Sequence, residues 1–301
     1  MMYFGLFLAA LTAFVAAIPL PASTSPAAPC PSTLVKENQS TAFGWQLVGT
    51  SSDASTLDQT CNQLQTDQLS KWGNFGLALS KVQTPVCNAL TSKASDALPK
   101  VVAANTKIIT NLLTSSFKKD DVQTYGYLCD NLRYEQVSGF LLDDATIINA
   151  TCNLGAERLN PRPFTAVDGA KANRTAVAAY NDAQSNLYAY LYAAQAGSPE
   201  ELNTLCEASQ SKARQADYEA LQLDPDCVSQ TICSIKEPIS VAEGKEQLKK
   251  WTSVSYANVL VHSSNAPGYV QVLCEKLDTA SLEAAGLDAE VVKNAACSGS
   301  A

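Results

Sequence analysis

The sequence has few of the residues and motifs on which metal and nucleophilic chemistry depend. It contains one histidine, His262, and no Cys-x-x-Cys pair, so a zinc site is a poor interpretation of its ten cysteines. It also lacks GxSxG, HExxH, P-loop, dinucleotide-binding and EF-hand motifs. These absences argue against the common hydrolases, metalloenzymes and nucleotide-binding enzymes, and we expect neither a metal nor a cofactor.

Basic clusters and long apolar segments are also missing. The 21 Lys and Arg residues are scattered and the net charge is −8, which argues against a nucleic-acid partner. The one apolar run, within residues 1–17, is followed by small residues and prolines and has the layout of a secretory signal peptide. No later segment approaches the length of about 18 apolar residues that a membrane span needs. We therefore expect a secreted protein, or one in the lumen of the secretory pathway, without a membrane span.

Cysteines and sequons agree with export. Asn38, Asn149 and Asn173 each begin an Asn-x-Ser/Thr sequon and are candidate glycosylation sites. An even number of cysteines in an oxidising compartment is expected to pair completely.

Alternating Val, Thr and Tyr runs are nearly absent, and Ala, Leu, Gln, Lys and Glu are abundant, so the pattern predicts an all-α protein.

The cysteines recur with one period. Four pairs share it: Cys61 and Cys206, Cys129 and Cys274, and Cys152 and Cys297 at 145 residues, and Cys87 and Cys233 at 146. This predicts two tandem homologous halves. We divide the chain into a signal peptide (1–17), a first helical lobe (18–160), a linker (161–175) and a second helical lobe (176–301).

Each half is itself doubled, because related phrases surround the first cysteine of four successive quarters: TCNQL, LCDNL, LCEAS and LCEKL. The pairing that respects this repeat is Cys61–Cys87, Cys129–Cys152, Cys206–Cys233 and Cys274–Cys297. Cys30 and Cys227 lie outside the period and are expected to pair with each other. Four cysteines within a half allow three connectivities, so cross-pairing stays open at this point.

A capping signal precedes the second cysteine of the quarters. Asp143, Asp224 and Asp288 each lie nine residues before a cysteine, and Ser80 lies seven before Cys87. Asp and Ser are favoured N-cap residues. The carboxylate pair formed by Asp143 and Asp144 is therefore better explained as a cap and a first-turn charge than as an acid/base couple.

Two helix faces are candidate ligand walls. Tyr188 and Tyr192 are spaced to stack on one helix, which is either an ordinary core helix or a ligand wall. Trp251, Asn258 and His262 share a second face, which is either a pocket wall or a helix end whose His favours the dipole.

Arg158 and Arg162 lie in the segment that joins the halves. That segment is either a solvated, proline-stiffened connector or an anion clamp between the lobes.

Taken together, the signal peptide, paired cysteines, sequons and absent cofactor motifs resemble in class the fungal hetero-Diels–Alderases of tropolone–sesquiterpene biosynthesis. The resemblance implies a cofactor-independent pericyclase that binds an apolar, oxygen-bearing small molecule, but it assigns no catalytic residue. A cycloaddition needs a dry pocket that aligns two partners rather than a nucleophile or a metal. The alternative class is a non-catalytic secreted effector or a cell-wall or ligand-binding protein.

Overall fold

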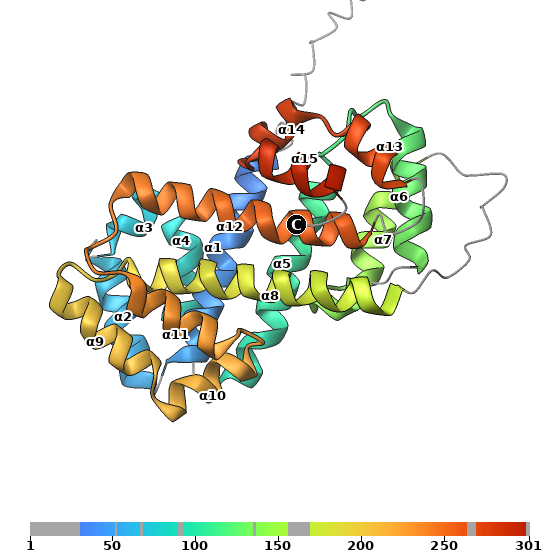
Figure 1. The fold of residues 1–301 in the computed structure, drawn as a ribbon. Helices are drawn as coiled ribbons and strands as arrows, with labels where there is room; N and C mark the ends of the chain where they lie inside the picture. The colour runs from blue at the N-terminus through green and yellow to red at the C-terminus, as the bar shows by residue number, and fades with distance from the viewer. Residues whose placement is uncertain are drawn as a thin grey trace, which may run out of the picture.

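The computed structural model describes residues 31–51, 53–66, 69–89, 93–134, 137–155, 169–263 and 269–298 of the 301-residue chain. The side chains of residues 134, 138, 169–174 and 269–270 lie outside this description. All regular structure within the described ranges is helical, which confirms the predicted all-α class (Figure 1). The predicted signal peptide, Cys30, Arg158 and Arg162 lie outside the described residues.

The helices follow one order four times. In each of four segments, a long helix is followed by a helix that carries a cysteine, a short helix, and a second cysteine helix. Segment 1 (31–89) contains α1 (Pro31–Thr50), α2 (Ala54–Gln65), α3 (Ser70–Phe75) and α4 (Leu79–Asn88). Segment 2 (93–155) contains α5 (Ala94–Leu113), α6 (Val122–Tyr134), the 3-10 helix η1 (Val137–Phe140) and α7 (Asp144–Cys152).

The second half of the chain repeats the order. Segment 3 (169–235) contains α8 (Gly169–Ala193), α9 (Pro199–Ser209), α10 (Lys212–Ala220) and α11 (Pro225–Ser234). Segment 4 (240–298) contains α12 (Val241–His262), α13 (Tyr269–Lys276), α14 (Thr279–Ala284) and α15 (Ala289–Ser298). Superposition of the two halves at an offset of about 145 residues stays a prediction.

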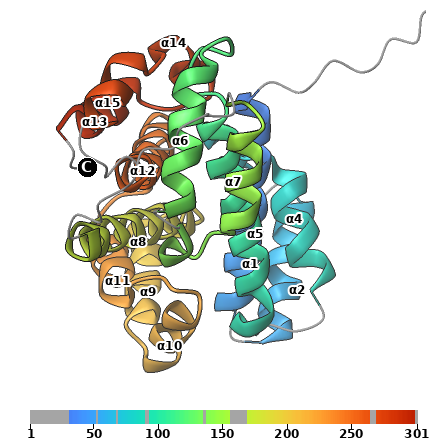
Figure 2. The same cartoon turned by 90° about the vertical axis from the view of Figure 1, so that its right-hand side faces the viewer.

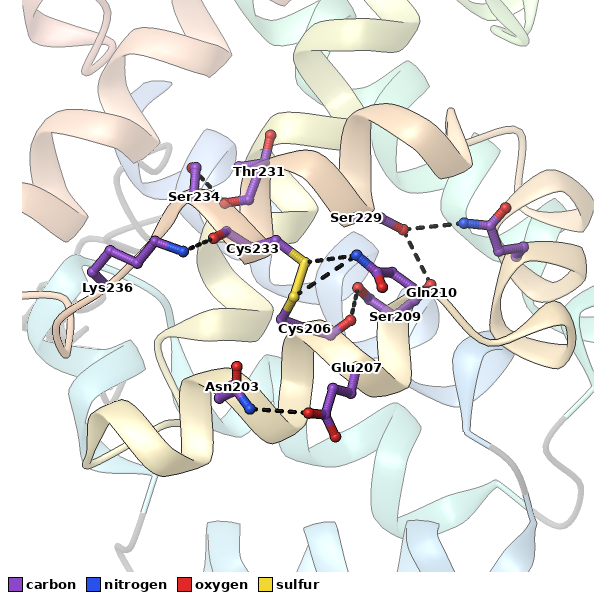
Figure 3. Close-up of a disulfide and its surroundings, with 11 residues drawn as sticks. Asn203, Cys206, Glu207, Ser209, Gln210, Ser229, Thr231, Cys233, Ser234 and Lys236 are labelled. Carbon is purple, nitrogen blue, oxygen red and sulfur yellow. Dashed lines mark hydrogen bonds between the residues drawn. A yellow bond between two sulfur atoms is a disulfide. The ribbon is translucent and has the colours of Figure 1, made fainter.

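One disulfide closes each segment by joining its two cysteine helices. The bonds are Cys61–Cys87, Cys129–Cys152, Cys206–Cys233 and Cys274–Cys297. The pairing that follows the repeat is therefore confirmed, and cross-pairing within a half does not occur. Figure 3 shows the bond between Cys206 and Cys233, where the side-chain amide of Gln210 lies 3.3 Å from Cys233 Sγ.

Within the described part of the chain, Cys227 is half-buried and forms no disulfide. Its sulfur lies 3.2 Å from Nδ2 of Asn186, and burial together with the charges of Asp182 and Asp224 raises its pKa to about 11. Since Cys30 lies outside the described residues, the expected Cys30–Cys227 bond stays a prediction.

Each segment makes the same turn after its short helix. Among the described residues, positive φ angles occur at four positions, and these are the equivalent positions of the four segments: Gly76 (120°), Leu141 (52°), Gln222 (59°) and Gly286 (87°). The next residue is always a buried leucine, namely Leu77, Leu142, Leu223 or Leu287. A left-handed residue ends the short helix and turns the chain into the second cysteine helix.

A buried hydroxyl on each long helix fixes the start of that second cysteine helix. The backbone N–H of Asp143 donates to Thr106 Oγ1 at 3.0 Å, and that of Asp224 donates to Ser185 Oγ at 2.7 Å. Segments 1 and 4 repeat the bond, from Ala78 to Ser40 at 2.8 Å and from Asp288 to Ser253 at 2.7 Å. The hydroxyl of the long helix thereby accepts a hydrogen bond from a backbone N–H that has no acceptor within the second cysteine helix.

The predicted caps are confirmed in three segments and wrong in one. Asp143, Asp224 and Asp288 accept from backbone N–H groups of α7, α11 and α15. Hydrogen bonds from Thr146 lower the pKa of Asp143, as expected for a capping carboxylate. Ser80 is not a cap: it lies inside α4, whose N-cap residue is Ala78. Ala78 has no side-chain acceptor, so α4 has no side-chain cap and keeps only the bond from the Ala78 N–H to Ser40, which the other three segments make as well.

The long helices form two crossed pairs. α1 packs along α5 and α8 packs along α12, and Figures 1 and 2 show the second pair lying across the first. One hydrophobic cluster consists mainly of residues from segments 1 and 3, among them Trp72, Tyr188 and Tyr218. The other consists mainly of residues from segments 2 and 4, among them Phe140 and Tyr256. Each core therefore joins residues from both halves of the chain, and the lobes inferred from the cysteine period, 18–160 and 176–301, do not have separate cores.

Candidate ligand-binding groove

The crossing point of the four long helices is polar and closely packed. Gln39 Nε2 of α1 donates to Thr252 Oγ1 of α12 at 2.6 Å, and Gln184 Nε2 of α8 donates to Ser255 Oγ of α12 at 2.9 Å. Asn105 Nδ2 of α5 donates to Gln184 Oε1 at 3.4 Å, so all four long helices take part in these hydrogen bonds. The enclosed volume here is about 20 Å³, which is room for roughly one water molecule. This interior space does not suit an organic ligand.

Of the expected ligand-wall residues, Tyr188, Asn258 and His262 are buried. Tyr188 and Tyr192 do stack, with ring centroids 5.6 Å apart and 12° between their planes. Asn258 Nδ2 donates to the Val254 carbonyl within α12 at 2.9 Å. The His262 ring, in the last turn of α12, lies 5.0 Å from that of Phe140.

Trp251 lies beside the ammonium of Lys250, which is 4.5 Å from the centre of its ring. Trp251, Asn258 and His262 line neither the central space nor the three surface cavities described next. A ligand role for these three residues stays a prediction.

The largest of the cavities described here is an open groove of about 380 Å³ between α2, α9 and the turn that joins α8 to α9. Its lining residues are Gln63, Leu69, Gln195, Ala196, Glu201, Thr204 and Leu205. Leu69 and Ala196 belong to the core of segments 1 and 3, and Leu205 packs against it. The groove, as we call this surface, thus has an apolar floor and amide side chains at one end.

A narrower cavity, which we call the cleft, adjoins that end. It has a volume of about 150 Å³ and shares Gln63 and Gln195 with the groove. The other residues that line it are Leu47, Thr50, Ser51, Thr56, Gln59, Thr60, Tyr192 and Arg214. Nearly all of these side chains are polar, and the single charged group among them is the Arg214 guanidinium.

Tyr192 lines the cleft and belongs to a cluster with two buried tyrosines, Tyr188 and Tyr218. Tyr188 stacks on Tyr192 and contacts the edge of Tyr218, whose ring centroid is 5.8 Å away. Burial raises the pKa values of Tyr188 and Tyr218 far above the ordinary range for phenols. These two phenols are neutral at physiological pH and support Tyr192, whose ring faces the cleft.

A third cavity, of about 190 Å³, opens between α1, α12 and the turns at Gly76 and Gly286. Lys36, Lys245 and Lys249 line it and are all exposed. This lysine cavity is a second place where anions can gather, so any test of the cleft needs a control here.

Two of the three predicted glycosylation sites have described side chains. Asn149 is exposed on α7, whereas Asn38 is half-buried and its Nδ2 donates to the Leu34 carbonyl within α1 at 2.7 Å. Asn173 lies on α8, but its side chain is outside the described set.

Sequence reasoning identified Tyr192 but missed the groove, the cleft and Arg214. One signal was available: Thr56, Gln59, Thr60 and Gln63 follow a helical spacing and place uncharged polar groups on one face of α2. This face of α2 lies near α8 because segments 1 and 3 pack together. No local sequence pattern predicts that packing.

No helix within the described ranges is long and apolar enough to cross a membrane. The described residues also contain no group of three His, Cys, Asp or Glu side chains arranged to hold a metal ion. Comparison with family models, curated proteins and solved structures gave no match.

Proposed function

We propose that this is a secreted helical protein that binds an apolar, oxygen-bearing small molecule in the groove. The groove volume of about 380 Å³ is the observation that carries the proposal, because small-molecule sites begin at about 300 Å³. The four disulfides of the protein suit an exported protein, because such bonds persist in an oxidising compartment. Two of them, Cys61–Cys87 and Cys206–Cys233, anchor the groove helices α2 and α9.

The lining indicates how such a molecule would lie. Leu69, Leu205 and Ala196 offer apolar surface for the body of the ligand. Gln63 and Gln195, at the junction with the cleft, can donate to or accept from its oxygen atoms. A ligand with an apolar body and an oxygen at one end would match both regions.

A pair of neighbouring substitutions tests this proposal. Thr204 lines the groove, whereas Asn203 is exposed on the same helix and its side chain bonds Glu207 instead (Figure 3). We expect carvone, a neutral apolar enone, to give saturation-transfer NMR signals with the wild type and with Asn203→Phe, and much weaker ones with Thr204→Phe. Equal signals from the two variants would show that carvone does not occupy the groove.

The catalytic form of the proposal is a cofactor-independent hetero-Diels–Alder reaction. The oxygen-containing diene of a quinone methide and an apolar alkene would form one C–C and one C–O bond, with no group leaving. The protein would contribute alignment of the two partners and hydrogen bonds to the diene oxygen, from Gln63 and Gln195 at the junction or from Tyr192 and Arg214 in the cleft. Incubation with an ortho-quinone methide and a cyclic alkene tests this form, and product ratios unchanged by the protein would reject it while leaving binding intact.

The second candidate function is a non-catalytic effector or cell-wall protein. The packing at the centre of the helix crossing favours it, because the 20 Å³ space there leaves no internal binding site. A protein of this kind would bind isolated fungal cell-wall material as tightly after Thr204→Phe as before it. Loss of that binding in Thr204→Phe would point back to the groove.

A further inference from the structure

Arg214 is a half-buried cation that forms no ion pair with an acidic group among the described residues. It lies in α10 and contributes its guanidinium to the cleft. Removing a charge from water is costly unless a counter-charge or hydrogen bonds compensate for it. Arg214 therefore gives the cleft a positive charge with which a bound anion can pair.

The acidic groups nearby do not supply that partner. Asp217, three residues further along α10, influences Arg214 electrostatically but forms no ion pair with it among the described contacts. Burial raises the pKa of Asp217, and the positive charge of Arg214 opposes part of that rise. Glu201 lines the groove rather than the cleft, and its Oε2 accepts from the Gly197 N–H at 2.6 Å.

Segments 2 and 4 show what the same arrangement looks like without a cleft. Leu260 follows Tyr256 by four residues as Tyr192 follows Tyr188, and Ser263 holds the position of Gln195. Asn131 follows Cys129 by two residues as Gln63 follows Cys61. The residues at these three positions in segments 2 and 4 are completely buried.

The counterpart of α10 agrees with this comparison. α14 occupies the same place in segment 4 and carries no basic residue. In segments 2 and 4 the same order of helices therefore forms without counterparts of Tyr192, Gln195 or Arg214. These three side chains are available for a ligand.

We propose that the ligand is a carboxylic acid, with its carboxylate bound by Arg214 in the cleft and its apolar body in the groove. This inference rests on the proposed function and names the chemical class of the ligand. A planar guanidinium matches a carboxylate through two parallel hydrogen bonds. The amides of Gln63 and Gln195 and the Tyr192 hydroxyl line the same space and can donate to the carboxylate.

The dimensions of the two cavities fit this division. The cleft, at about 150 Å³, holds a carboxylate and a few adjoining atoms, and the shared residues Gln63 and Gln195 allow the ligand to continue into the groove. Leu69 and Leu205 then cover the apolar part. A neutral analogue of the same shape would fill the groove but leave Arg214 without its partner.

The test compares 4-phenylbutanoate with its uncharged amide, 4-phenylbutanamide, by isothermal titration calorimetry on the disulfide-bonded protein. We expect the acid to bind the wild type about tenfold or more tightly than the amide. Arg214→Gln should remove that difference, and Arg214→Lys should restore part of it. A circular dichroism melt of each variant checks that the fold is retained.

Two control variants separate the cleft from other basic surfaces. Arg133→Gln changes an exposed arginine on α6, and Lys249→Gln changes the lysine cavity. Both should keep the preference for the acid. If that preference disappears in Lys249→Gln instead of Arg214→Gln, the inference is wrong.

The remaining outcomes separate the inference from the proposed function. Equal affinity of acid and amide for the wild type overturns the carboxylate assignment and leaves the groove proposal standing. Binding of neither compound overturns the carboxylate assignment as well. The groove proposal is then decided by the neutral enone and the Thr204→Phe and Asn203→Phe pair.

Discussion

The phenol of Tyr188 in α8 donates a hydrogen bond to Thr50 Oγ1 at the end of α1, across 2.9 Å and 138 residues of sequence. The Thr50 hydroxyl donates its one proton to the Gln46 carbonyl, so in the bond with Tyr188 the phenol is the donor. Tyr256 of α12 makes the equivalent bond to Ser116 Oγ at 2.5 Å, just beyond the end of α5. One such bond joins segment 1 to segment 3, and the other joins segment 2 to segment 4.

Removing either buried phenol should destabilise the protein. We expect Tyr188→Phe and Tyr256→Phe each to lower the free energy of unfolding by about 1 kcal/mol, because each deletes one buried hydrogen bond. Urea denaturation followed by circular dichroism measures this. Tyr192→Phe is the control and should change stability by less than about 0.5 kcal/mol, since its hydroxyl borders the cleft. Wild-type stability in Tyr188→Phe would show that the bond contributes nothing.

The left-handed turn positions predict opposite effects of glycine and alanine. Gly286 has a φ of 87°, and a Cβ added there would meet no atom within 4 Å, so Gly286→Ala should cost about 1 kcal/mol through backbone strain alone. Gln222 has a φ of 59°, so Gln222→Gly should raise the free energy of unfolding by about 0.5 kcal/mol. Thermal unfolding of both variants checks the signs. A stabilising Gly286→Ala would contradict the assigned turn.

The four disulfides should contribute almost equally to stability. Their sequence separations are 26, 23, 27 and 23 residues, and loops of this length stabilise by about 3 kcal/mol in the chain-entropy model. Replacing both cysteines of one pair by serine, one pair at a time, should give four similar losses of unfolding free energy. A single pair whose removal costs far more than the others would reveal a contribution beyond loop closure.

At alkaline pH the protein should unfold in the same pH range in which its buried phenols ionise. Burial raises the pKa of Tyr125 to about 12 from an ordinary value of 10, so the native state holds this proton more tightly than the unfolded state. The resulting stability is fully present below pH 10 and is lost as pH rises towards 12. Tyrosine absorbance at about 295 nm and far-UV circular dichroism, recorded during one titration, should show a late ionisation step that coincides with loss of helix. If all tyrosines ionised near their ordinary pKa with the helices intact, these phenols would not be buried.

Local features of this fold were predictable from sequence, and contacts between segments were not. The cysteine spacing predicted four correct disulfides, and the Asp-to-Cys spacing predicted the caps of α7, α11 and α15, because both depend on residues within one segment. Ser80 was misassigned because the N-cap residue of α4 is Ala78, which has no side-chain acceptor, and Ser80 lies inside the helix.

The candidate site shows the same limit. Tyr192 was identified from its helix face, but its partner residues come from α1, α2 and α10. The pairing of segment 1 with segment 3 brings these helices together, and it is visible only in tertiary contacts such as the shared hydrophobic core and the bond between Tyr188 and Thr50. Arg214 has no distinctive neighbours in the sequence, so its position in the cleft follows from tertiary structure alone.

The most direct test of the ligand-binding proposal is an NMR titration of the ¹⁵N-labelled protein with carvone. We predict that the largest amide shift changes occur at Gln63, Gln195, Thr204 and Leu205, the residues that line the groove, and that they saturate with a single affinity. Changes centred instead on Trp251, Asn258 and His262, or the absence of any change at saturating carvone, would contradict the proposal.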